Sequence, residues 1–189
     1  MKVNALHATT AIALAAGLAA CSSTGADRAN PRTVASANLN AAVGVAQPNP
    51  QSPVQGTLTF SELRGIVSVS GTVTGLKPNS AHAFHIHEKG DCSAPDFASA
   101  GGHFNPTSMP HGAHGSGLHH LGDMPPLLAD ASGTAQVSFN SQSLTLRGPN
   151  SVITKSVIVH RDPDDVNAQP TGNAGPRLAC GVIQLKPAA

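Results

Sequence analysis

His82-Ala-Phe-His-Ile-His87 places histidines and apolar residues alternately along its second half. On a β-strand successive side chains point to opposite faces, so His85 and His87 share one face and the two intervening apolar residues share the other. The pattern predicts a strand whose apolar residues fill a core and whose two imidazoles form a two-ligand metal site on the outer wall. His82 is expected on the same face as Phe84 and Ile86, which points to the core. We therefore interpret it as a structural histidine with satisfied hydrogen bonds.

Strand signals recur on both sides of this segment, while helical periodicity is absent. The 189 residues include 19 Gly and 15 Pro, which favour many turns over long helices. The chain therefore predicts an all-β domain, a sandwich or a barrel. The expected strands cover residues 39–46, 54–60, 66–76, 81–88, 134–139, 152–160 and 178–185.

Two long irregular segments separate these strands, and we call residues 89–126 the first loop and residues 161–177 the second loop. Loops of this length without regular structure are usually functional or disordered. Several imidazoles with one carboxylate are ligands that Zn²⁺ favours, and ten His against five Phe is a strong excess. The candidate ligands in and beside the first loop are His103, His111, His114, His119, His120 and Asp123, and His160 ends a strand rich in Val and Ile.

The N-terminus predicts export. Lys2 precedes an apolar run that ends at residue 20, which reads as a signal peptide over residues 1–20. Leu18-Ala-Ala-Cys21 resembles a bacterial lipoprotein processing site, which implies lipidation of Cys21; the alternative is an ordinary signal peptide with an incidental cysteine. Residues 21–37 predict a flexible tether, and residues 38–189 the folded domain.

Charge and cysteine content narrow the possible partners. Charged residues make up only 11% of the chain and the formal net charge is +1, so there is no basic patch for nucleic acid. Three cysteines would leave one odd thiol in an exported protein. If Cys21 carries lipid, Cys92 and Cys180 remain as a pair, and an oxidising compartment permits their disulfide.

Four segments carry a resemblance to a known family: His85-Ile-His87, Gly101-Gly-His-Phe-Asn-Pro106, His120-Leu-Gly-Asp123 and Gly172-Asn-Ala-Gly-Pro-Arg177-Leu-Ala-Cys180-Gly-Val-Ile. In this order they resemble the signature segments of copper–zinc superoxide dismutases, over about residues 39–185, and in particular the exported bacterial branch. The resemblance implies an eight-stranded Greek-key β-barrel flattened toward a sandwich, an architecture of which this family is itself an example. It also implies dismutation of superoxide to hydrogen peroxide and dioxygen, with copper and zinc ions as cofactors.

The resemblance assigns the site residues one by one. Copper would be bound by His85, His87, His103 and His160, and zinc by His103, His111, His120 and Asp123, so that the imidazolate of His103 bridges the two ions. His120 is preferred over His119 because only His120 has the family's His-x-x-Asp spacing. Asp164 would tie a copper-bound histidine to a zinc-bound one. Arg177 would guide the anion, and Thr171 would form the opposite wall of the substrate channel.

Two other functions compete with this assignment. A copper- and zinc-binding envelope protein without turnover would share the fold, because fold does not fix function. A zinc hydrolase would need an open position on zinc, which the four assigned ligands fill. The expected partners are superoxide as substrate and a membrane through the lipid on Cys21, in a monomer or homodimer. The expected location is the bacterial envelope facing the periplasm, and Ser22 after Cys21 favours the outer membrane by analogy.

Overall fold

The computed structural model describes residue 1 and residues 33–186, so the predicted export signal, Cys21 and most of the predicted tether lie outside the described residues. The regular structure of the described part is β, apart from a 3-10 turn at Ala98–Ala100. None of its helical segments has the length and apolar character of a membrane span. The strands are β1 (Thr33–Ala41), β2 (Gln55–Leu63), β3 (Ile66–Thr74), β4 (Ala81–His82), β5 (Phe84–His87), β6 (Leu127–Leu128), β7 (Ala135–Ser141), β8 (Ser156–His160), β9 (Arg177–Val182) and β10 (Gln184–Leu185).

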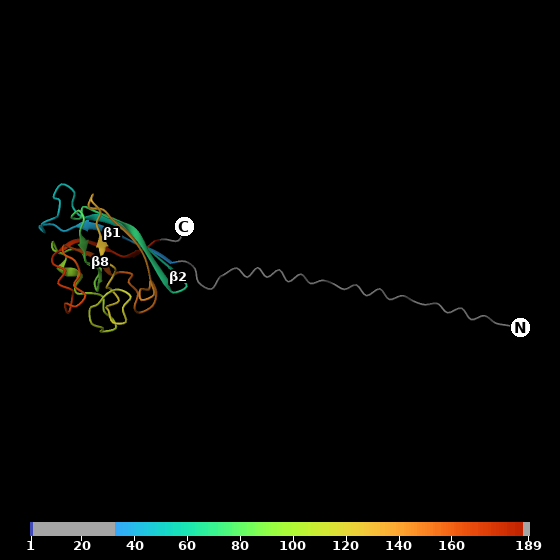
Figure 1. Ribbon diagram of the computed structural model, residues 1–189. Helices are drawn as coiled ribbons and strands as arrows, with labels where there is room; N and C mark the ends of the chain where they lie inside the picture. The colour runs from blue at the N-terminus through green and yellow to red at the C-terminus, as the bar shows by residue number, and fades with distance from the viewer. Residues whose placement is uncertain (2–32, 187–189) are drawn as a thin grey trace.

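Eight of these strands form one curled antiparallel sheet (Figure 1). The order is β5-β8-β9-β1-β2-β3-β7, with β10 paired to β1, and β4 pairs separately with β6. Strands distant in the sequence are neighbours at β5–β8, β9–β1 and β3–β7, so long connections cross between them. The predicted all-β Greek-key fold is confirmed, and the two predicted loops lie between β5 and β6 and between β8 and β9.

The first strand requires a correction to the predicted boundaries. Residues 33–37, predicted as tether, belong to β1, whereas residues 42–46, predicted as strand, lie outside it. Ala35 and Ala37 are the reason, because they point into the core and pair with Phe60 and Leu58 of β2. Alanine is a weak strand former, so a buried alternation made of alanines and serines gives little signal in the sequence.

Two further predicted strands are interrupted. The segment 81–88 divides at Ala83 into β4 and β5, and 178–185 divides at Ile183 into β9 and β10. The predicted strand 152–160 is regular only from Ser156, because Thr154 has a φ of 62° in a turn. These interruptions leave the β5–β8 and β8–β9 pairings intact, which are the pairings that position the histidines.

The core and the functional face lie on opposite sides of β5. Phe84 and Ile86 are fully buried among the apolar residues of the sheet, as the alternation predicts. Burying such side chains contributes about 1.5–3 kcal/mol each. His85 and His87 face the other way and are buried too, because the two loops cover this outer wall. The site is therefore enclosed between the sheet and the loops.

Candidate metal centre

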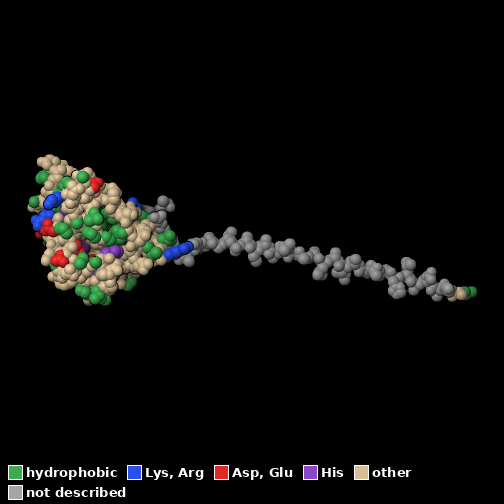
Figure 2. Space-filling model, viewed as in Figure 1, with side chains coloured by type: hydrophobic (Ala, Val, Ile, Leu, Met, Phe, Trp, Pro, Cys, Tyr) green, Lys and Arg blue, Asp and Glu red, His purple; other side chains and the backbone are tan. Residues whose placement is uncertain are grey.

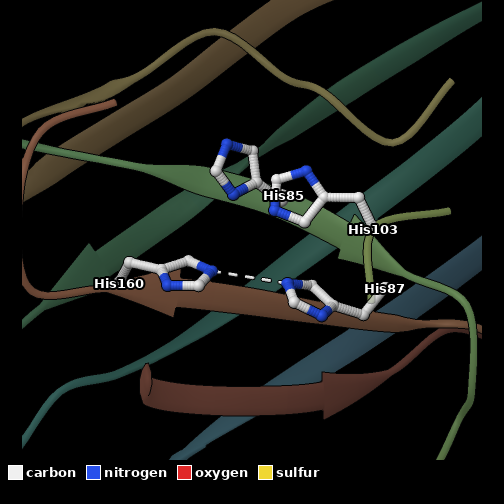
Figure 3. A group of neighbouring side chains, drawn as sticks. All are labelled: His85, His87, His103 and His160. Carbon is white, nitrogen blue, oxygen red and sulfur yellow. Dashed lines mark hydrogen bonds between the residues drawn. The ribbon is translucent and has the colours of Figure 1, made fainter. Parts of the chain in front are cut away.

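Four imidazoles converge over β5 and β8. His85 and His87 come from β5, His160 from the end of β8 and His103 from the first loop, and one nitrogen of each lies within 4.8 Å of the others (Figure 3). The Nε2 atoms of His87 and His160 are 3.3 Å apart. Antiparallel pairing of β5 with β8 brings the strand histidines together, and an isolated bridge between His87 and His103 holds the loop residue beside them.

Backbone carbonyls orient two of these rings. His87 Nδ1 lies 2.9 Å from the Gly101 carbonyl oxygen, and His160 Nδ1 lies 3.2 Å from that of Gly175. Because a carbonyl only accepts hydrogen bonds, each Nδ1 carries the proton and each Nε2 presents a lone pair to the group. This is the arrangement by which proteins fix the tautomer and orientation of metal-bound histidines.

Burial keeps these rings neutral. Desolvation is the main cause that lowers the pKa of His87 to about 2, and repulsion from His160 adds to it. Desolvation likewise lowers the pKa of His160 to about 3, with repulsion from His85 as the next cause. Neutral imidazole is the form that binds metals, so the group is ready for a cation at neutral pH.

A second group adjoins the first and consists of His103, His111, His120 and Asp123. Asp123 Oδ1 lies 3.0, 3.1 and 3.2 Å from the Nδ1 atoms of His103, His111 and His120. Its Oδ2 accepts hydrogen bonds from the backbone N–H groups of Gly112 and His120. Burial acts to raise the pKa of Asp123, but the hydrogen bonds and nearby rings outweigh it and hold the pKa well below its usual range.

Two residues connect the groups. His103 belongs to both, with Nδ1 beside Asp123 and Nε2 buried without a hydrogen-bond partner. Asp164 spans the outside: its Oδ1 lies 3.0 Å from His111 Nε2 and its Oδ2 lies 3.4 Å from His85 Nε2. Burial acts to raise the pKa of Asp164, but the interaction with His85 and the electrostatic effect of His111 together outweigh it and lower the pKa.

The donors fit a copper ion and a zinc ion. Among the described residues, four buried histidine nitrogens have no hydrogen-bond partner: His85 Nδ1, His85 Nε2, His103 Nε2 and His111 Nδ1. An unsatisfied buried polar atom costs about 1–3 kcal/mol, and a bound cation would remove that cost. Four imidazoles suit copper, whereas three imidazoles and a carboxylate form a closed tetrahedral set of the kind that zinc takes.

A pocket of about 370 Å³ opens over the first group and is lined by His87, His103, His160, Thr171 and Arg177, among others. Arg177 is half-buried and donates hydrogen bonds to the carbonyl oxygens of Phe97, at 2.5 Å, and Gly101, at 2.7 Å. The four histidines of the first group are buried, and the face shown in Figure 2 has only small areas of histidine surface. Access to the buried imidazoles therefore runs past Thr171 and Arg177.

The predicted disulfide between Cys92 and Cys180 is confirmed. It joins the first loop to β9, three residues beyond Arg177. Because the same part of the first loop supplies Gly101, the disulfide stabilises the segment whose carbonyl holds both His87 and Arg177.

Within residues 33–186, three other histidines lie outside both groups. His82 is buried and has partners on both nitrogens, Ser80 Oγ at 2.9 Å and the His160 carbonyl oxygen at 3.0 Å, in agreement with its structural interpretation. His114 and His119 lie together elsewhere on the first loop, with ring centroids 5.6 Å apart. Cys21 falls outside the described residues.

Gln169 is a supporting residue that sequence reasoning missed. Its side-chain amide donates to the His111 carbonyl at 2.8 Å and accepts from the His111 N–H at 2.9 Å. This pair of hydrogen bonds fastens the second loop to a residue of the first loop. The two residues are 58 positions apart, and no local motif links a glutamine to a backbone amide at that separation.

Comparison with known proteins gives consistent results. The family model for copper/zinc superoxide dismutase matches residues 54–183. The chain is 42% identical over 139 residues to "Superoxide dismutase [Cu-Zn]" of Paramecium bursaria Chlorella virus 1, covering 70% of this chain and 74% of the relative. It is 41% identical over 150 residues to "Superoxide dismutase [Cu-Zn] 2" of Brassica juncea, covering 76% and 97%. Among solved structures, the clock protein EA4 is similar, with a TM-score of 0.70, 34% identity and coverage of 81% of this chain and 94% of that one.

Proposed function

The chain belongs to the copper/zinc superoxide dismutase family, and from this premise we propose how its two histidine groups divide the work of the enzyme. The reaction converts two superoxide anions and two protons to dioxygen and hydrogen peroxide. Copper would be held by His85, His87, His103 and His160, and zinc by His103, His111, His120 and Asp123. The observation that carries this division is that one ring, His103, contributes to both groups through its two nitrogens.

Bound copper supplies the one-electron oxidation and reduction that dismutation requires. The protein's residues bind the metals, orient the ligands and exclude bulk water from the site. His103 Nε2 faces the first group with no other partner, which suits it to hold a proton there and pass it to the reduced oxygen product. Asp164 keeps His85 and His111 in fixed orientations. The loops bury the ligands, and the pocket beside Arg177 is where a small anion can approach His87, His103 and His160.

Metal analysis and an activity assay test this proposal together. Metal-free protein reconstituted with both ions should contain near-equal copper and zinc and should dismutate superoxide, while chelated protein should not. Active, fully loaded protein containing zinc alone would contradict the copper assignment. Full loading without turnover would favour the alternative of a non-catalytic metal-binding protein, against which the pocket and its half-buried Arg177 weigh.

Arg177 is proposed to attract superoxide to the pocket. We expect Arg177→Ala to lower the rate roughly tenfold or more and to flatten its dependence on ionic strength, an electrostatic effect for which superoxide dismutases are a standard example. Rates measured from low to high salt check this. Arg161→Ala is the matched control, because Arg161 is exposed and pairs with Asp162 at 2.8 Å. An unaltered salt profile in Arg177→Ala would place the steering charge elsewhere.

We further propose that lipid on Cys21 anchors the enzyme to an envelope membrane, facing the periplasm, with the outer membrane favoured. The apolar run before Cys21 supports export, and the Cys92–Cys180 bond is compatible with an oxidising compartment. Cys21→Ser should move most of the protein from the membrane to the soluble fraction after cell breakage. Ser22→Ala should leave the protein membrane-bound. Continued membrane fractionation of Cys21→Ser would end the lipid-anchor idea.

A further inference from the structure

His114 and His119 are the histidines of the first loop that the dismutase site does not use. Their ring centroids are 5.6 Å apart, close to the 5.5 Å that separates His87 and His160 within the first metal group. The spacing of the His114 and His119 rings therefore resembles that of His87 and His160, which are assigned to one ion.

Hydrogen bonds orient both rings in the manner of metal ligands. His114 Nδ1 lies 2.9 Å from the Asp123 carbonyl oxygen, and His119 Nδ1 lies 2.6 Å from the His120 carbonyl oxygen. Carbonyls only accept, so both Nδ1 atoms carry the proton and both Nε2 atoms keep a lone pair. The same use of carbonyls orients His87 and His160. An edge contact with Phe139, with centroids 5.4 Å apart, further restrains the His114 ring.

The surroundings leave room for an ion and its water. Both rings are partly exposed, unlike the buried ligands of the two metal groups. A Cβ added at Gly115 or Gly117, between the two histidines, would meet nothing within 4 Å, so this part of the loop faces open space. An ion from solution can reach the pair without opening the dismutase site.

Loop composition defines which cations suit the pair. Residues 105–122 contain no Asp, Glu, Lys or Arg, and their other histidines, His111 and His120, belong to the second group, so the pair offers a cation two imidazoles and no carboxylate. Imidazole favours Ni²⁺, Cu²⁺ and Zn²⁺, whereas Ca²⁺ and Mg²⁺ require oxygen ligands. We propose that His114 and His119 form a third, exchangeable metal site for one imidazole-preferring divalent cation on the outer surface of the first loop.

Nickel binding to the copper- and zinc-loaded protein tests the site, because nickel is distinguishable from both resident metals. Calorimetric titration should show one additional Ni²⁺ per chain and no comparable binding of Ca²⁺. His114→Gln and His119→Gln should each weaken nickel binding roughly tenfold to a hundredfold, since even the loss of a supporting contact changes metal affinity by that much. Ser116→Ala, a change between the two histidines, should bind nickel as the parent does.

A second measurement on the unaltered chain guards against loop damage in the variants. Ni²⁺ should slow modification of His114 and His119 by diethyl pyrocarbonate, as located by peptide mapping, while copper and zinc contents stay constant. Equal modification rates with and without Ni²⁺, unchanged nickel affinity in both glutamine variants, or displacement of zinc in place of additional binding would each overturn the third site.

Discussion

His160→Ala is expected to lower superoxide dismutation by roughly a hundredfold or more while leaving the fold intact. Loss of the proposed copper ligand should cost at least as much as loss of a supporting contact, for which tenfold to a hundredfold in affinity or activity is typical. His160 Nε2 lies 3.3 Å from His87 Nε2, at the end of β8 where the pocket opens. Without this ring the copper group keeps three imidazoles.

The fold should survive because the backbone of His160 keeps its own contacts. Its N–H donates to the Ala83 carbonyl at 2.9 Å, and its carbonyl oxygen lies 3.0 Å from His82 Nδ1. Neither hydrogen bond needs the imidazole. Rate measurements, copper and zinc analysis and thermal unfolding on the same preparation separate loss of copper from loss of structure.

Ser156→Ala is the matched control for this variant. Ser156 lies in the same strand, is fully buried, and its hydroxyl has no hydrogen-bond partner, so its removal should leave activity unchanged. Turnover of His160→Ala equal to that of Ser156→Ala would refute the role given to His160.

Alternation in the sequence was enough to predict the two faces of β5. A period of two residues is a local property, and the core on one side with the imidazoles on the other follows from it directly. The same reasoning placed the imidazoles on an outer wall, but it had no means of showing that two loops cover that wall. The burial that lowers the pKa of His87 and His160 is therefore a product of tertiary structure.

The contacts that orient the ligands could not be predicted from the sequence for a related reason. The partners of His87 and His160 are backbone carbonyls of Gly101 and Gly175, and every residue has a carbonyl. Gln169 reaches the backbone of a residue 58 positions away, through contacts that only the folded loops create. A histidine can be recognised as a candidate ligand from its side chain alone. The orientation of its ring depends on backbone groups of other segments, whose side chains are not involved.

Removal of the disulfide is expected to have the largest effect on stability. The bond joins residues 88 positions apart, and the chain-entropy model assigns about 4–5 kcal/mol to closing a loop of that length, as an upper value. Cys92→Ser/Cys180→Ser should therefore unfold at a clearly lower denaturant concentration. The double variant is preferred because a single one would leave a reactive thiol.

The copper group should weaken in this variant as well as the fold. The disulfide fastens the first loop to β9, and that loop supplies the Gly101 carbonyl that accepts from both His87 Nδ1 and Arg177 Nη2. A mobile Gly101 would release both groups, so copper affinity and rate should fall with stability while the zinc ligands around Asp123 are less affected. Denaturation of metal-free and loaded protein, with Ser93→Ala as the exposed neighbouring control, separates the two effects. Parent-like stability and copper affinity in the double variant would show that packing alone holds this loop.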